Sequence, residues 1–148
     1  MFADPRSDQQ APQLDNLAFT TAAPDDSFAT VGAEITLVFT VRDNSVLPAN
    51  VPSVTINSLT QTATSVVDVG TDGKAKTFTY KYTVPTAATH DSTIGYSVST
   101  VDAAGNTVSA TSAPADLITI GKWLLNNMLF SRAYSAFAHR LLLLRRCA

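Results

Sequence analysis

The side chains best suited to chemistry lie in the segment Asp102-Ala103-Ala104-Gly105-Asn106. Carboxylate and amide oxygens are the ligands that calcium prefers, and Asp15 or Asp43 could complete a set with Asp102 and Asn106. The segment also fits a tight turn, in which Asp102 accepts hydrogen bonds from backbone N–H groups while Gly105 adopts a left-handed conformation. Because no carboxylates lie here at the short fixed spacings of a calcium loop, we expect a turn. A calcium site at Asp102, Asn106 and Asp15 is the alternative, and no other cofactor is indicated.

Residues that could catalyse a reaction are not arranged for it. His90 lies in Thr89-His90-Asp91-Ser92, where neighbours along one loop cannot orient one another as the base and nucleophile of a triad. Cys147 stands at the end of the chain beside two arginines, without a pocket around it. The sequence has no glycine-rich phosphate loop and no Cys/His metal spacing. We therefore expect no enzymatic activity.

Short strands must position these loops, because the chain alternates apolar and polar residues between regularly spaced turn signals. Gly70 and Gly73, for example, predict a hairpin turn that needs positive φ. With no interleaved helical pattern, this arrangement predicts an all-β, antiparallel sandwich of seven or eight strands. The predicted strands are residues 17–21, 34–41, 53–57, 64–69, 77–84, 93–101, 107–111 and 116–120.

The aromatic residues could bind a ligand or fill the core. Phe78, Tyr80 and Tyr82 recur at period two in one strand, and would form a sugar-stacking platform if their face were exposed. Large exposed apolar patches are uncommon, so we expect these three in the core. Tyr96, early in the penultimate strand, suits a tyrosine corner that packs and caps a loop.

Composition and charge narrow the function classes. Charged residues make up 15% of the 148 residues, below the roughly 25% of an average protein, and the single cysteine excludes an internal disulfide. The first 121 residues contain twelve acidic and five basic side chains, whereas the last 27 contain five basic and no acidic ones. An acidic body lacks the basic face that a nucleic acid requires, so we expect no nucleic-acid partner.

Three segments follow from this pattern. Residues 1–14 form a polar, flexible lead-in without the apolar core of a secretory signal. Residues 15–121 form the sandwich. Residues 122–148 are basic and apolar and predict a helical tail. Three interpretations of the tail remain open: an amphipathic helix on a membrane surface, a poor transmembrane anchor, or a segment translated out of frame.

Three stretches of the chain resemble one family of repeats. These are VGAEITLVFTV at 31–41, YTVP at 82–85 and IGYSVSTVDAAGN at 94–106. Residues 15 to 120 are thus similar to the bacterial immunoglobulin-like repeats that occur in tandem in large surface and adhesin proteins, and the hyalin-type repeats share the DAAGN ending. The resemblance implies an immunoglobulin-like sandwich that is extracellular and non-enzymatic.

We therefore expect a spacer or adhesion module of a larger cell-surface protein, with neighbouring immunoglobulin-like domains or a surface ligand as partners. The alternative is a membrane-associated domain that binds a carbohydrate or a protein and is tethered by residues 122–148.

Overall fold

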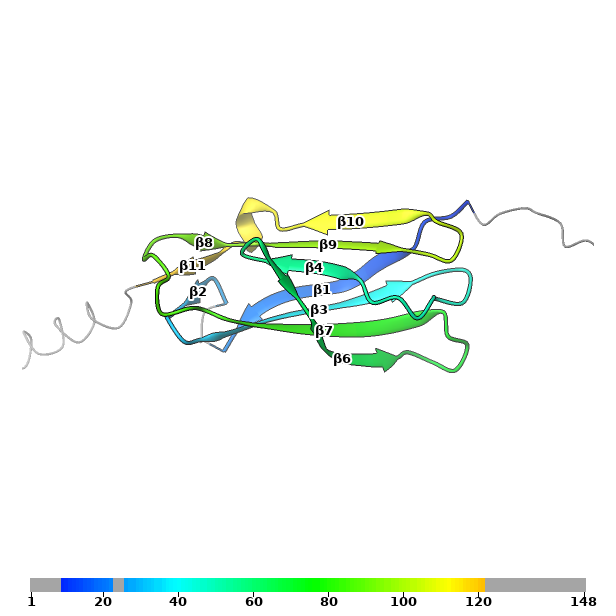
Figure 1. Ribbon diagram of the computed structural model, residues 1–148, viewed down its shortest axis with the longest axis horizontal. Coiled ribbons are helices and arrows are strands. Elements are labelled where there is room, and N and C mark those ends of the chain that lie inside the picture. The colour runs from blue at the N-terminus through cyan, green and yellow to red at the C-terminus, as the bar shows by residue number, and fades with distance from the viewer. Residues whose placement is uncertain (1–8, 23–25, 122–148) are drawn as a thin grey trace, which may run out of the picture.

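Two four-stranded antiparallel sheets and one small three-stranded sheet make up the fold (Figure 1). The computed structural model describes residues 9–22 and 26–121. The expected all-β, sandwich-like fold is confirmed. The predicted tail at 122–148 lies outside the described residues, as does most of the 1–14 lead-in. Within the described part, no helix has the length and apolar character needed to cross a membrane.

The first sheet has the order β1-β3-β7-β6, and every neighbouring pair is antiparallel. Its two central strands are in register through the pairs Ile35–Tyr82, Leu37–Tyr80 and Phe39–Phe78, which all point inward. Because side chains alternate between faces, this one register buries the complete aromatic stripe of β7. The bounds are β1 Gln13–Thr21, β3 Glu34–Arg42, β6 Ala63–Asp68 and β7 Ala75–Thr83.

The second sheet has the order β10-β9-β4-β5, and the small sheet has the order β2-β11-β8. The chain passes from the second sheet to the first between Gln61 and Ala63. In the small sheet, β11 pairs antiparallel with β8 but parallel with β2. The bounds are β2 Phe28–Ala29, β4 Ser53–Ile56, β5 Leu59–Gln61, β8 Thr93–Ile94, β9 Tyr96–Val101, β10 Thr107–Thr111 and β11 Ile118–Ile120.

Buried side chains from all three sheets form one hydrophobic cluster. Phe39 stacks on Tyr80 with ring centroids 5.8 Å apart and ring planes 7° from parallel. Burial of one such side chain contributes about 1.5–3 kcal/mol, so the cluster is the main source of stability. The expected core position of Phe78, Tyr80 and Tyr82 is confirmed, since at most 6% of each is exposed.

The polar ends of these tyrosines are satisfied inside the fold. The Tyr80 hydroxyl donates to the carbonyl oxygen of Pro52 at 2.9 Å. The amide nitrogen of Asn57 donates to the Tyr82 hydroxyl oxygen at 3.0 Å. Each bond fixes a loop or turn of the second sheet against the first.

Several expected boundaries were wrong for identifiable reasons. The first strand begins at Gln13, inside the segment expected to be a flexible lead-in. The strand expected at 93–101 is divided at Gly95. The residues before Gly95 pair with β11, whereas those after it pair with β10. At the division, Ser112 Oγ accepts the Tyr96 N–H at 3.2 Å. The strand expected from residue 116 begins at Ile118, after a short 3-10 helix, Pro114–Asp116.

The described chain begins and ends at opposite ends of the long axis (Figure 1). We call the end with residue 9, the β6–β7 turn and the β9–β10 turn the N-terminal pole. The end where β11 finishes is the C-terminal pole. The predicted calcium ligand Asp102 therefore lies at the N-terminal pole.

Candidate functional site

The β9–β10 turn holds Asp102 in the way that the turn interpretation predicts. Asp102 is 4% exposed. Its Oδ1 accepts the backbone N–H groups of Ala104 and Asn106, both at 2.8 Å, and its Oδ2 accepts Asn106 Nδ2 at 2.7 Å. Gly105 supplies the left-handed residue with φ of +94°. Both carboxylate oxygens are thus bonded within the turn.

Two opposing effects act on the pKa of Asp102. Burial alone would raise it, but the hydrogen bonds from Asn106, Ala104 and Gly105 together outweigh burial, and the pKa lies below its usual value. The group is therefore ionised at neutral pH, and its charge is stabilised by donors of its own turn. This is the environment of a structural turn carboxylate.

The structure brings together two of the three predicted calcium ligands. Asp102 and Asn106 are hydrogen-bonded to each other, whereas Asp15 lies on β1 with its Oδ2 2.9 Å from Arg42 Nε. Asp43, the alternative third ligand, has a buried Oδ2 without a hydrogen-bond partner among the described residues. No group of three His, Cys, Asp or Glu side chains that could hold a metal occurs in residues 9–22 and 26–121. The calcium site remains a prediction.

The loop with His90 contains no nucleophile and base in contact. The Ser92 hydroxyl donates to the carbonyl oxygen of Thr89 at 2.6 Å, and the Asp91 N–H donates to Ile120 O at 2.8 Å. His90 is exposed. These bonds close the loop at the C-terminal pole.

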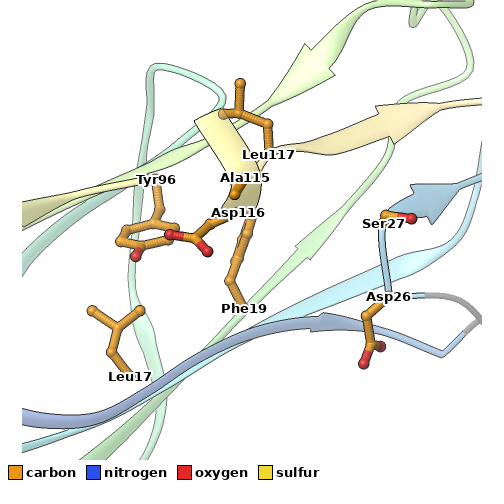
Figure 2. Close-up of a pocket in the computed structure, with 8 residues that line it drawn as sticks. All are labelled: Leu17, Phe19, Asp26, Ser27, Tyr96, Ala115, Asp116 and Leu117. Atoms are coloured by element: carbon orange, nitrogen blue, oxygen red, sulfur yellow. The ribbon is translucent and has the colours of Figure 1, made fainter. Parts of the chain in front are cut away.

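A hollow on the flank of the molecule was not predicted. It has a volume of about 370 Å³, within the range of small-ligand sites. Its walls come from segments far apart in the sequence (Figure 2). No local sequence motif therefore predicts the hollow. The lining residues are Leu17, Phe19, Asp26, Ser27, Tyr96, Ala115, Asp116 and Leu117.

Tyr96 is the central polar group of this hollow. It is 7% exposed, and its ring meets Phe19 edge to face with centroids 5.1 Å apart. Burial raises the pKa of Tyr96, and the nearby charge of Asp116 raises it further, so the hydroxyl stays protonated at neutral pH. The prediction that Tyr96 forms a tyrosine corner was correct for the ring and not for the hydroxyl. The ring packs inward, but within the described part of the chain the hydroxyl bonds to no loop.

Comparison of the chain with protein-family models, with curated proteins and with solved structures finds no match.

Proposed function

We propose that the chain is a non-enzymatic, extracellular immunoglobulin-like module that acts as a spacer or adhesion domain of a larger cell-surface protein. The observation that carries the proposal is the position of residues 9 and 121, the ends of the described part, which lie at opposite poles of an elongated sandwich (Figure 1). Copies joined end to end would extend along one line, and each would add its full length to the distance spanned.

The strand order supports the immunoglobulin-like part of the proposal. Immunoglobulin sandwiches pack one sheet of order A-B-E-D against another with strands C, F and G. The order β1-β3-β7-β6 corresponds to A-B-E-D, and β10-β9-β4 corresponds to G-F-C. The additional β5 continues the second sheet beyond β4 by three residues, Leu59–Gln61.

The pairing of the outer strands supports a role under tension. Strand β2 runs parallel to β11, and the N–H groups of Thr119 and Gly121 donate to Ser27 O and Ala29 O at 2.8 and 3.0 Å. Tension between the poles slides β11 along β2, and β1 along β3, so their hydrogen bonds are loaded together rather than one after another. A pair of strands that is sheared resists force better than one that is unzipped.

The extracellular location is supported by the resemblance of residues 31–41, 82–85 and 94–106 to tandem surface repeats. Antibodies raised against residues 9–121 test it directly. We expect them to label intact cells that express the parent protein, with little additional signal after permeabilisation. An antibody against a cytoplasmic protein is the control. Labelling that requires permeabilisation would contradict an extracellular module.

A further inference from the structure

The flank hollow combines an apolar wall with two carboxylates, those of Asp26 and Asp116. Leu17, Phe19 and Leu117 supply the apolar surface, and the rings of Phe19 and Tyr96 are in contact. Figure 2 shows the Asp116 carboxylate next to the Tyr96 ring, with Asp26 on the other side of Phe19. No cationic side chain of residues 9–22 and 26–121 forms an ion pair with either carboxylate.

The bonds that these carboxylates do form leave capacity for a ligand. Asp26 Oδ1 accepts the Thr21 N–H, and Asp116 Oδ2 accepts the Ala113 N–H, each at 3.3 Å. These are long contacts, and each uses one oxygen. The remaining oxygens can accept further donors.

Tyr96 adds a hydrogen-bonding group to the apolar wall and the carboxylates of the hollow. Its side chain is nine-tenths buried, yet its hydroxyl lines the hollow without a hydrogen-bond partner in the described part of the chain. Among the described residues the buried side-chain polar atom without a partner is Asp43 Oδ2, so the Tyr96 hydroxyl is accessible from the hollow and can bond to a group that enters it. A ligand with N–H donors could bond to the hydroxyl oxygen and to the Asp116 carboxylate near it.

We propose that the flank hollow binds an arginine or lysine side chain of a partner polypeptide. The aliphatic stem lies against Leu17, Phe19 and Leu117, and the cationic head meets Asp116 beside the Tyr96 ring. Aromatic faces and carboxylates are the two groups that attract such a head. The excess of acidic residues over basic ones in the first 121 residues also steers a basic partner toward this surface.

This proposal does not rest on the spacer function. The hollow is formed by β1, β9, the 3-10 helix and the residues before β2, so it exists within a single module.

The probe for the test is Nα-acetyl-arginine amide, and its uncharged control is Nα-acetyl-citrulline amide, which has nearly the same shape. Each is titrated into the full ¹⁵N-labelled chain while amide signals are followed by NMR. We expect the arginine probe to shift the signals of Phe19, Tyr96 and Leu117, and to bind about fivefold more tightly than the citrulline probe.

Two variants and a matched control locate the binding. Asp116→Asn keeps an oxygen for the Ala113 N–H but removes the charge, and Tyr96→Phe removes only the hydroxyl. Each should weaken arginine binding about threefold. Asp68→Asn removes an exposed charge from the far edge strand β6 and should change nothing. Equal binding of the two probes, signal shifts outside the hollow, or unchanged binding by Asp116→Asn would each overturn the proposal.

Discussion

Tyr80, Tyr96 and Asp102 are all buried residues, but their polar groups have different hydrogen-bonding surroundings. The hydroxyl of Tyr80 donates to Pro52, the carboxylate of Asp102 is saturated by its own turn, and the hydroxyl of Tyr96 faces a hollow. The sequence predicted the Asp102 turn because its donors are local. It could not predict the surroundings of Tyr96, because Asp116 and Phe19 reach that ring through the tertiary fold.

At the residue scale, replacement of Asp102 should lower stability in a pH-dependent way. An asparagine has one acceptor oxygen, whereas the turn directs donors at both carboxylate oxygens, so Asp102→Asn leaves one donor unpaired. Because the folded pKa is lowered, the stabilising effect of the carboxylate is present above the unfolded value of 3.8 and is lost as the pH falls through the folded pKa.

Thermal unfolding from pH 7 to pH 2.5 checks this prediction. The melting temperature of Asp102→Asn should lie below that of the wild type at pH 7, and the difference should narrow below about pH 4. Asp68→Asn, at an exposed position, is the control. A constant difference across the whole range would show that the charge of Asp102 is not involved.

Tyr80→Phe should remove one hydrogen bond, and it should also remove the loss of stability at alkaline pH that ionisation of Tyr80 causes. Loss of the donor to Pro52 costs about 1–2 kcal/mol. Burial raises the pKa of Tyr80 from 10.0 to about 12. The folded state therefore holds a proton that the unfolded chain releases, and stability is full below pH 10 and declines as the pH rises toward 12.

Urea unfolding at pH 7, 10 and 11.5 measures both effects of Tyr80→Phe. The variant should be less stable than the wild type at pH 7, and the difference should shrink at pH 11.5. If both proteins lose the same stability between pH 10 and 11.5, Tyr80 does not cause the alkaline transition.

At the element scale, long alternating strands were predictable, whereas two of the very short ones, β2 and β5, were not. Strands β3 and β7 each carry a full inward stripe, so their periodicity alone identified them. Strand β2 has two residues and β5 has three, too few to show a period, and their pairing depends on partners that the sequence does not indicate. The change of pairing partner from β11 to β10 at Gly95 was not predictable, because apolar and polar residues continue to alternate across it.

The β4–β5 turn gives a prediction at this scale. Asn57 and Ser58 both have positive φ, 52° and 62°, as a two-residue type I′ turn requires. A left-handed backbone conformation costs a residue with a Cβ about 1–2 kcal/mol of folding stability, and glycine avoids this strain. Glycine also increases the conformational entropy of the unfolded chain, which lowers stability by about 0.4–1 kcal/mol. Ser58→Gly should therefore stabilise the protein by about 0.5–1 kcal/mol.

Chemical denaturation measures the effect of Ser58→Gly against a matched change. Ser109→Gly is made at an exposed position of β10 with ordinary strand φ and should destabilise by about 0.5–1 kcal/mol. Destabilisation by both glycines would mean that Ser58 is not strained.

At the scale of the whole molecule, the fold class followed from the number and spacing of strands, whereas the flank hollow did not. The hollow forms where β1, β9 and the 3-10 helix meet, and each contributes residues with ordinary local patterns. The core cluster is formed by residues between Ala29 and Ile120. The described part of the chain thus contains a hydrophobic interior to which all three sheets contribute.

Deletion of residues 122–148 should leave this interior intact. The shortened chain should retain a β-type circular dichroism spectrum and a single cooperative unfolding transition in urea. A gradual transition, or loss of the β signal, would show that the tail completes the core.

A spacer module must transmit tension between its poles, and pulling on single molecules measures whether this module does so. Four copies of residues 1–121 are joined in series and stretched through their two ends. We expect one sharp unfolding event per copy at a similar force, each releasing about 3.5 Å of length per residue less the folded span. The same module stretched through cysteines placed at residues 72 and 104, both at the N-terminal pole, should unfold at a lower force. Equal forces in the two geometries, or extension without distinct events, would show that the module does not carry tension between its poles.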